Sequence, residues 1–399
     1  MRVDHVSFSA GGGAGRVARD IVSAQREAGV DAVFAHLYDS DLARQPFHSP
    51  RVSLAALIDS FVLSNRSAHT LSSLTRSRVS NLQRVNVRPD SIINLHWIEG
   101  VATTEDLKHL ESAGRKIYWT MHDMRPLTGF CHHSHDCSGF TNGCANCPQA
   151  RTIFRPLVAS SLKRKSELLP SRDSLKVIVP SEWMKTKVRQ SPLFSGHEIA
   201  VIPNPVAKAF LTKVTRQQAR RELGLTQTSF VGISVAEQLD SKAKRIKESM
   251  DVFFSVATKL GIESSYILVG NGGAAFESRP GVLHLPTRDS EGVARAISAS
   301  DVLINMSLAE SFGMTVVEAA ALGVPSVARR VGGMQESIQS GTTGFLCDNE
   351  IDLESALIKL AQDPVLAGQL GTQAKRKCLD KHSASSVAAS YLKFYALTG

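Results

Sequence analysis

The chain of 399 residues lacks several features that mark particular classes of protein. It has no run of 18 or more apolar residues, so it has no hydrophobic segment long enough to span a bilayer. Aromatic residues are only 6% of the chain and are not interleaved with the basic ones, which argues against nucleic acid as a partner. The N-terminus leads directly into a strand pattern without an apolar signal segment, and we therefore expect a cytoplasmic protein.

The chain does contain enough apolar material for more than one core. Hydrophobic residues are 43% of the sequence, and 399 residues exceed the size at which a single core stops growing. Short apolar runs alternate with helical patterns, which predicts α/β domains with parallel, doubly wound sheets. The expected strands are Arg2–Phe8, Ala32–Leu37, Ile92–Leu95, Lys116–Met121, Lys176–Val179, Ile199–Ile202, Phe230–Val235, Tyr266–Val269, Val282–Leu285, Val302–Asn305 and Ser326–Ala328.

The net charge of +9 is distributed unevenly along the chain. Residues 1–200 contain 25 Lys and Arg against 18 Asp and Glu, whereas residues 201–399 contain 21 against 19. A basic half suits an acidic partner, such as an anionic lipid surface or a diphosphate-linked acceptor, but a solvated helix face gives the same pattern. The residues expected to contact an anionic surface are Arg155, Lys163, Arg164 and Lys165.

The most informative segment is residues 301–338. A short apolar strand is followed by the loop Glu310-Ser311-Phe312-Gly313 and then by a helical pattern, with Glu318 in the second turn of that helix. Such a turn places unpaired backbone N–H groups and the positive helix end at the carboxyl edge of a sheet, which suits a phosphate. Carboxylates beside the phosphate can accept hydrogen bonds from hydroxyl groups. The segment therefore predicts a nucleotide-sugar site, although acids are also favoured near helix starts for structural reasons.

The paired glutamates belong to a wider pattern. Glu310-x7-Glu318, Gly323-x-Pro325 and Gly332-Gly333-x-x-Glu336 together resemble the donor-site signature of family-four retaining glycosyltransferases, the glycosyl transferases group 1, which have the GT-B fold. Segments at residues 11–15, 179–183 and 201–205 resemble further parts of that family in the expected order, so the resemblance spans nearly the whole chain.

The resemblance implies a domain organisation. Two Rossmann-like domains would face each other across a cleft, with residues 1–205 on the acceptor side and residues 206–383 binding the nucleotide sugar. A Cys-rich loop at residues 131–147 would belong to the first domain. The last segment, residues 384–399, would form a helix that packs back on the first domain.

In the second domain, the resemblance assigns roles to the donor-loop residues. Glu310 would be catalytic by holding the hydroxyls of the donor sugar, and Glu318 would hold the ribose. The backbone amides of Ser311, Phe312 and Gly313 would cradle the sugar and the phosphate.

In the first domain, two places at strand ends are candidates. Gly12 and Gly13 lie between a strand and a helix, so that backbone could approach a ligand closely, but glycines also serve tight strand-to-helix turns. The resemblance places this loop near the donor diphosphate and the acceptor. His122 follows an expected strand at the carboxyl edge of the sheet, where ligands gather. The resemblance makes His122 a cleft residue with a catalytic role, and a structural histidine is the alternative.

Three basic residues after the strand Phe230–Val235 are candidates for binding the diphosphate. Lys244 is the first choice, with Lys242 and Arg245 behind it, because the leaving diphosphate needs at least one cation. The sequence departs here from the family pattern, since Glu237 stands where a basic residue is often found. A solvated lysine at a helix start is the alternative for any one of them.

The resemblance also implies the chemistry. A sugar would pass from a nucleoside-diphosphate sugar to a glycan acceptor with retention of configuration, and no metal cofactor would be required. Bacterial exopolysaccharide and colanic-acid enzymes, which the chain resembles, use lipid-linked acceptors, so we expect peripheral attachment to the inner face of the cell membrane. Two alternatives share the fold: an epimerase, which would turn over the sugar without an acceptor, and a non-catalytic nucleotide-sugar-binding protein.

Four of the six cysteines cluster, with the spacing C-x5-C-x6-C-x2-C. Disulfides are not expected in a cytoplasmic protein, so clustered thiols suggest a structural zinc, although the first spacing is wider than usual. Free buried thiols are the alternative. The candidate ligands are Cys131, Cys137, Cys144 and Cys147.

Overall fold

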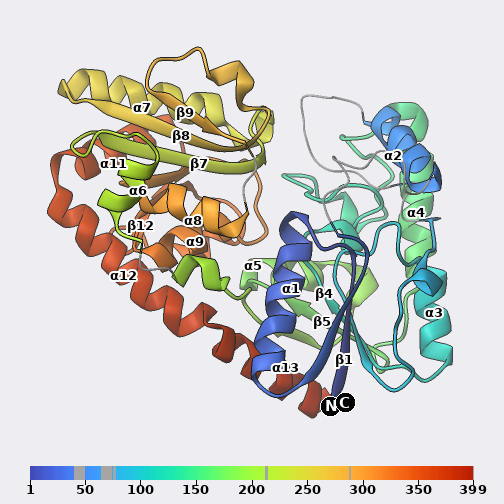
Figure 1. Cartoon of the computed structure of the whole chain (residues 1–399). Helices are drawn as coiled ribbons and strands as arrows, with labels where there is room; N and C mark the ends of the chain where they lie inside the picture. The colour runs from blue at the N-terminus through green and yellow to red at the C-terminus, as the bar shows by residue number, and fades with distance from the viewer. Residues whose placement is uncertain (40–49, 64–73, 75–77, 212–213, 287–288, 399) are drawn as a thin grey trace. The chain divides into compact units, whose positions relative to one another are not determined.

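The computed structural model describes residues 1–39, 50–63, 74, 78–211, 214–286 and 289–398. The chain divides into two compact units, the first formed by Met1–Pro205 with Ala384–Gly399 and the second by Val206–Ser383. Each unit contains its own six-stranded parallel sheet with helices on both faces (Figure 1). The predicted α/β class with two parallel, doubly wound sheets is confirmed. No helix in the described ranges has both the length and the apolar character needed to cross a membrane.

The sheet of the first unit has the order β2-β1-β3-β4-β5-β6. All six strands are parallel, but β2 lies on one side of β1 whereas β3 to β6 lie on the other. Open parallel sheets bind ligands at the carboxyl ends of the two strands beside such a switch point, which here are β1 and β3. Its strands are β1 (Arg2–Ser9), β2 (Asp31–Tyr38), β3 (Ile92–Leu95), β4 (Ile117–Thr120), β5 (Leu175–Val179) and β6 (Ile199–Val201). Its helices are α1 (Gly12–Glu27), α2 (Pro50–Val62), α3 (Thr104–Ser112), α4 (Arg155–Leu168), α5 (Glu182–Gln190) and α13 (Ala384–Thr398).

The sheet of the second unit has the order β9-β8-β7-β10-β11-β12. In this sheet β8 and β9 lie on one side of β7, whereas β10 to β12 lie on the other. The carboxyl ends of β7 and β10 are therefore the switch point of this unit. Its strands are β7 (Phe230–Gln238), β8 (Ser264–Asn271), β9 (Val282–Leu285), β10 (Val302–Asn305), β11 (Ser326–Arg329) and β12 (Gly344–Cys347). Its helices are α6 (Arg216–Glu222), α7 (Ile246–Leu260), α8 (Ser290–Ser298), α9 (Met314–Leu322), α10 (Met334–Ser337), α11 (Glu350–Gln362) and α12 (Pro364–His382).

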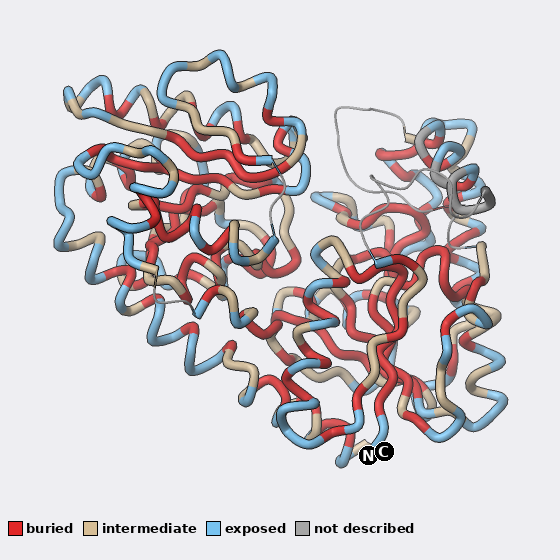
Figure 2. Tube along the Cα trace, viewed as in Figure 1, coloured by how far each residue is buried: buried red, intermediate tan, exposed pale blue. Residues whose placement is uncertain are grey.

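Helices cover both faces of each sheet. In the first unit α1 packs with α13 on one face and α3 with α4 on the other (Figure 1). In the second unit α7 packs with α11, and α8 packs with α9 (Figure 1). Because both faces are covered, the strands are the most deeply buried part of each unit, as Figure 2 shows. This burial explains the continuous apolar runs from which the strands were predicted.

One strand of the second sheet was not predicted from the sequence. β12 has only four residues, of which Gly344 and Cys347 are buried. Gly344 has φ 152°, and a Cβ atom there would lie 2.3 Å from the carbonyl oxygen of Ser326 on β11. The close approach to β11 therefore requires a glycine, and a glycine in a short apolar run weakens the strand pattern that sequence reasoning uses.

Candidate functional site

The two loops at the switch point of the second unit are joined through backbone and side chains. The N–H of Leu308, after β10, donates to the carbonyl of Ala243, after β7, at 2.8 Å. The same approach places Nζ of Lys244 at 2.6 Å from Oε1 of Glu310. Both side chains keep contact with solvent, at 34% exposure for Lys244 and 19% for Glu310. The structure thus brings together two predicted donor-site residues from different segments.

The Gly332-Gly333 pair supports the turn that carries Glu310. Gly333 donates its backbone N–H to the carbonyl of Glu310 at 3.1 Å. A Cβ atom on Gly332 would lie 1.7 Å from that carbonyl oxygen, and one on Gly333 would lie 2.3 Å from the carbonyl oxygen of Ser311. Gly332 also has a left-handed backbone, with φ +53°. The turn therefore packs backbone against backbone, which only glycine permits.

The rest of the turn leads into the start of α9. Ser311 and Phe312 are buried, and the Phe312 ring packs on His382 at 5.5 Å between ring centroids. The side chain of Phe312 is therefore part of the core, and only its backbone is available to a ligand. Gly313, with φ +88°, precedes α9, whose first turn has no acidic residue to offset the positive helix end. Glu318 lies half-buried on α9.

The other two basic candidates differ in their surroundings. Arg245 has a left-handed backbone with φ 53° and pairs with Glu350 and, at 3.6 Å, with Glu248. Its guanidinium is thus engaged by acids of α11 and α7. Lys242 is exposed at the start of a short 3₁₀ turn, Lys242–Lys244. Lys244 is the basic candidate that the structure places beside Glu310.

In the first unit, the Gly-rich turn joins β1 to α1. Gly12 has φ +67°, and a Cβ atom on Gly15 would lie 2.2 Å from the carbonyl oxygen of Ser9, so both positions need glycine for the turn itself. Gly13 is different, because a Cβ atom there would meet nothing within 4 Å. The open space at Gly13 leaves room for a ligand at the start of α1, and the fold does not explain why this residue is a glycine.

His122 follows β4 and is the last member of a chain of three histidines. Nδ1 of His5 lies 2.8 Å from Nε2 of His96, and Nδ1 of His96 lies 2.9 Å from Nε2 of His122. At the inner end of the chain, Nε2 of His5 lies 3.0 Å from Oε1 of Gln25 on α1. His5, His96 and Gln25 are buried, whereas His122 is partly exposed.

Burial governs the protonation of these rings. It lowers the pKa of His5 to about 4, and the hydrogen bond to Gln25 and the charge of Asp4 oppose this only in part. Burial likewise lowers the pKa of His122 to about 4 against the charge of Asp123. The pKa of His96 lies well below its ordinary value because of burial and then of repulsion from the neighbouring histidines. All three rings are neutral at pH 7.

The acid beside His122 has its own partner. Oδ2 of Asp123 lies 2.6 Å from Nδ1 of His132, and Oδ1 accepts the backbone N–H of Arg125 at 2.8 Å. Burial works to raise the pKa of Asp123, but the attraction and hydrogen bond of His132 lower it to about 2. Asp123 is therefore a fixed negative charge that holds the loop after β4.

Sequence reasoning found His122 but missed His5, His96 and Gln25. All three histidines come from neighbouring strands, because β1, β3 and β4 are adjacent in the sheet. His5 pairs in register with Asn94, two residues before His96. The sequence shows one histidine inside an expected strand and two others just after expected strands. Their contact could not be predicted from this pattern, because it depends on the order of the strands in the sheet.

The basic cluster on α4 does not form the surface that the sequence predicted. Lys165 is buried, and its Nζ donates to the carbonyls of Arg125 and Thr128 at 2.6 and 2.9 Å. Burial, followed by repulsion from Arg125, holds the pKa of Lys165 well below its ordinary value. The prediction that Lys165 contacts an anionic surface is therefore wrong, because its ammonium group caps backbone carbonyls inside the unit.

The other members of that cluster are only partly available. Arg164 pairs with Glu105, and Nε of Arg155 donates to the carbonyl of Cys147 at 3.1 Å. Lys163 is 78% exposed and lies 3.9 Å from Glu167. Lys163 is thus the member whose charge reaches solvent most freely.

The cysteine loop, residues 131–147, includes His132, which binds Asp123. Burial, followed by repulsion from Cys147 and Cys144, raises the pKa of Cys131 to about 12, so these three sulfur atoms lie within electrostatic range of one another. Burial is also the largest cause of the raised pKa of Cys144, which Cys147 and Cys137 raise further. Across the described ranges, however, no three His, Cys, Asp or Glu side chains are grouped so as to hold a metal ion. The zinc site stays a prediction.

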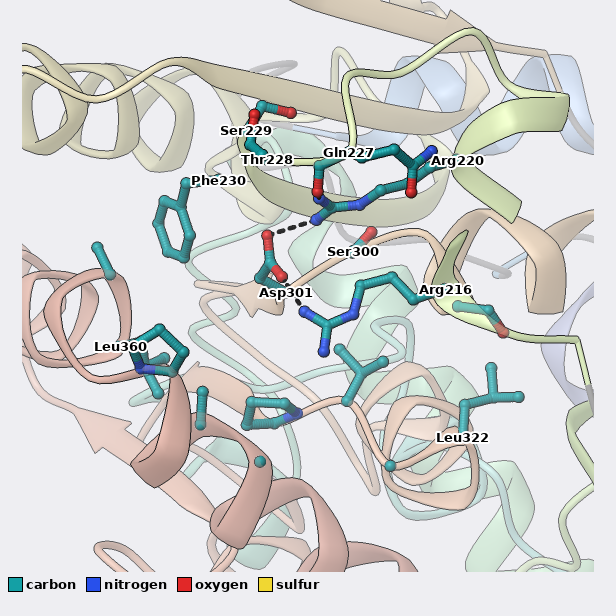
Figure 3. Close-up of a pocket in the computed structure, with 18 of the residues that line it drawn as sticks. Arg216, Arg220, Gln227, Thr228, Ser229, Phe230, Ser300, Asp301, Leu322 and Leu360 are labelled. Carbon is teal, nitrogen blue, oxygen red and sulfur yellow. Dashed lines mark hydrogen bonds and ion pairs between the residues drawn. The ribbon is translucent and has the colours of Figure 1, made fainter. Parts of the chain in front are cut away.

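A pocket of about 440 Å³ lies at the opposite edge of the second sheet from the donor loops. Its lining includes Phe230, the first residue of β7, and Asp301, which directly precedes β10 (Figure 3). Asp301 is occupied there, because it pairs with Arg216 and Arg220 and accepts the N–H of Val231 at 2.7 Å. These interactions tie α6 to the amino ends of the strands, at the edge of the sheet opposite the loops that carry Lys244 and Glu310.

Comparison with known proteins identifies relatives of this chain. Residues 231–363 match the family model described as glycosyl transferases group 1. The chain is 26% identical over 207 residues to N-acetyl-alpha-D-glucosaminyl L-malate synthase of Bacillus anthracis, which covers 50% of the chain and 53% of that protein. It is 24% identical over 344 residues to D-inositol 3-phosphate glycosyltransferase of Pseudarthrobacter chlorophenolicus, which covers 82% and 76%. The chain thus spans about half the length of the first of these relatives.

Solved structures with a similar fold cover the whole chain. Sucrose-phosphate synthase of Thermosynechococcus elongatus has a TM-score of 0.69 at 17% identity, covering 100% of this chain and 98% of that one. HepE of Anabaena, solved in complex with UDP and glucose, has a TM-score of 0.65 at 17% identity and covers 100% of both chains. Residues 231–363 of the second unit therefore match the glycosyl transferases group 1 model, and the chain as a whole has the two-domain α/β GT-B fold of these solved structures.

Proposed function

We propose that the protein transfers a sugar from a nucleoside-diphosphate sugar to a glycan acceptor with retention of anomeric configuration. The observation that carries the proposal is the Lys244–Glu310 pair at the switch point, near the start of α9, whose first turn contains no acidic residue. An ammonium group suits the diphosphate, a carboxylate suits sugar hydroxyls, and the two lie 2.6 Å apart. The match of residues 231–363 to glycosyl transferases group 1 supports the same reaction class.

In the proposed mechanism, Lys244 gains a second partner when the donor binds. Nζ has three N–H donors, so it can keep a hydrogen bond to Glu310 while it contacts the diphosphate. Negative charge grows on the leaving phosphate as the glycosidic bond breaks, and the ammonium group and the amides at the start of α9 stabilise that charge. Glu310 holds the sugar hydroxyls and Glu318 the ribose. The leaving phosphate helps to deprotonate the acceptor, so that no metal is required.

Two variants test the assignment of the donor site. Glu310→Ala should lower kcat/KM strongly while the protein stays folded, because an interaction that acts in the transition state is lost. Glu318→Ala should chiefly weaken nucleotide binding. The assay is sugar transfer with a panel of nucleotide sugars, chosen first by their effect on thermal unfolding. Near-normal turnover by folded Glu310→Ala would refute the assignment, and sugar turnover without any acceptor would identify an epimerase.

The configuration of the product tests retention separately. The NMR coupling of the anomeric proton in donor and product shows whether the configuration is kept. Retention requires the same anomer in both, and an inverted product would contradict the proposed mechanism while leaving glycosyl transfer intact.

The acceptor is proposed to be lipid-linked, as in bacterial exopolysaccharide synthesis, with peripheral attachment to the cytoplasmic face of the membrane. The relatives favour a second candidate, since their names give L-malate and D-inositol 3-phosphate, which are small anionic hydroxyl compounds. Sedimentation with anionic and neutral vesicles separates the two. Salt-sensitive binding to anionic vesicles that Lys163→Glu weakens supports the lipid-linked acceptor. Lys247→Glu, at a residue of similar exposure in the second unit, is the matched control.

Equal binding to both vesicle types, or none to either, would favour the small anionic acceptor.

A further inference from the structure

The histidine chain of the first unit is continuous and closely packed. His5 lies on β1, His96 directly follows β3 and His122 follows β4. The rings of His5 and His96 are stacked with their centroids 5.1 Å apart, and those of His96 and His122 with theirs 5.2 Å apart. Tyr391 of α13 covers His5 edge-on at 6.5 Å. The rings therefore have little freedom to turn, and each one constrains the hydrogen bonds of the next.

The inner end of the chain determines where the first proton lies. Oε1 of Gln25 is 3.0 Å from Nε2 of His5, and both side chains have no exposed surface. An amide oxygen accepts hydrogen bonds and cannot donate them. Nε2 of His5 must therefore carry the proton and donate it to Gln25.

The remaining protons follow from the rule that a neutral imidazole has one N–H group. With the proton of His5 on Nε2, its Nδ1 is an acceptor and receives the Nε2–H of His96. Nδ1 of His96 is then also an acceptor and receives the Nε2–H of His122. The lone pair left over is on Nδ1 of His122, and within the part of the chain that the structure describes this atom has no hydrogen-bond partner.

The charged groups around the three histidines do not change the positions of these protons. Asp4 acts on His5 and Asp123 on His122, and each raises the pKa of the ring it acts on. Burial outweighs both, so the rings stay neutral. Asp4 is also engaged by Arg88, with Nε at 2.7 Å from Oδ1, and Asp123 is engaged by His132.

We propose that Gln25, His5 and His96 are positioning residues that hold His122 as a neutral ring with its lone pair on Nδ1, where it accepts a hydrogen bond from a substrate hydroxyl. The proposal rests on the proposed function only for the source of that hydroxyl. The three histidines do not conduct protons, because the amide oxygen of Gln25 at the inner end is too weak a base to take up a proton. They keep each proton on one nitrogen.

The tautomer of His122 can be measured without any assay of activity. The full chain is labelled with ¹⁵N-histidine, and long-range ¹H–¹⁵N spectra show which ring nitrogen carries the proton. The signal of His122, one of 13 histidines, is assigned by its loss in His122→Gln. We expect the Nε2–H tautomer, with no protonation of the ring down to pH 5.

Gln25→Met tests the origin of the effect, because it removes the acceptor and keeps the length of the side chain. His122 should then populate both tautomers, and if these become equal, kcat/KM should fall roughly 2-fold because half of the molecules lack the acceptor. The matched control is Gln149→Met, which removes another buried amide of the same unit, one that donates to the carbonyl of His133 at 2.8 Å. The control should leave the His122 signal unchanged.

Two results would overturn the proposal. The first is a wild-type His122 with its proton on Nδ1, which would mean that the Gln25 amide faces His5 with its nitrogen and reverses every proton in the chain. The second is a folded Gln25→Met variant whose His122 signal equals that of Gln149→Met. If Gln25→Met does not fold, the wild-type spectrum still decides. Failure to bind any nucleotide sugar would refute the proposed function and leave the tautomer result standing.

Discussion

The two units place different chemistry at equivalent points of similar sheets. At the switch point of the second unit, Lys244 and Glu310 form a partly exposed ion pair, with Nζ and Oε1 2.6 Å apart. Near the switch point of the first unit, His5 and His96 are buried and neutral, and the open space at Gly13 lies at the start of α1. Burying a charge costs desolvation free energy that a charge near water does not lose, whereas a neutral ring can be buried if its nitrogen atoms have hydrogen-bond partners.

The difference teaches which ligand each point suits. A half-exposed ammonium group and a carboxylate can exchange partners with an incoming diphosphate and sugar. A buried chain of neutral rings cannot respond to charge, but it can present one fixed lone pair to a hydroxyl. The second unit is thus suited to the charged part of a nucleotide sugar and the first to hydroxyl groups.

The largest expected effect comes from removing the charge of Lys244. Lys244→Met should lower kcat/KM by roughly 10²- to 10³-fold, because growing charge on the leaving phosphate loses its cation. Lys247→Met is the matched control, since Lys247 is 75% exposed and pairs with Asp251. The measurement is steady-state sugar transfer. If the two variants behave alike, the Lys244–Glu310 pair is structural and the contrast between the units is lost.

The two Gly-rich turns can be compared with one substitution each. Gly332→Ala should destabilise the second unit by roughly 3 kcal/mol or more, because its Cβ atom would overlap the carbonyl of Glu310 in a left-handed backbone. Gly13→Ala enters open space and should change stability by less than about 0.5 kcal/mol. Thermal unfolding and sugar transfer are measured for both. A loss of activity in stable Gly13→Ala would mean that a ligand approaches there, and unchanged activity would mean that neither the turn nor a ligand requires glycine at this position.

Acid should weaken the first unit through its histidines. The pKa of His5 is about 4 in the fold and 6.5 ordinarily, so the unfolded chain binds the extra proton between these values. The stability is therefore complete above pH 6.5 and is lost as the pH falls toward 4, by an amount on the order of 3 kcal/mol for this ring. Denaturant unfolding at several pH values is compared for wild type and His5→Gln. If the free energy of unfolding falls equally with pH in the two proteins, the prediction is contradicted.

The cysteine loop gives the smallest expected effect on the whole chain. Purified protein should contain about one zinc per chain, and Cys144→Ser should release it and loosen the loop more than either sheet. Metal analysis and thiol titration of the native protein provide the measurement. No zinc in the native protein, together with four thiols that react only once it is unfolded, would show that Cys131, Cys137, Cys144 and Cys147 are ordinary free thiols.

The fold was predictable because burial on both faces makes parallel strands continuous apolar runs. Val302–Asn305 and Phe230–Val235 were found in this way, whereas β12 was missed because Gly344, needed for the approach to β11, is one of its four residues and leaves an apolar run of only three. The motif around Glu310 was visible because its residues are close in sequence. Its contact with Lys244 depends on a hydrogen bond between two loops, which spacing alone does not show.

Other features depend on strand order or on burial, and sequence patterns report neither directly. His5 and His96 meet His122 only because β1, β3 and β4 are neighbours in the sheet. Lys165 was read as a surface charge because it follows Lys163 and Arg164, but it faces the interior and donates to backbone carbonyls. A run of basic residues has the same appearance in sequence whether its members are solvated or buried.

The place of α13 has a consequence for synthesis. The last helix belongs to the first unit, where Tyr395 accepts a hydrogen bond from the buried Asn94 at 2.7 Å and Tyr391 covers His5. As the chain leaves the ribosome, residues 1–205 emerge with these side chains still lacking their partners, and the whole second unit is made before α13 arrives. The first unit to begin folding is thus the last to finish. A nascent chain stalled before residue 384 should expose the face of the first unit that α13 covers, including His5 and Asn94, to chaperones and proteases.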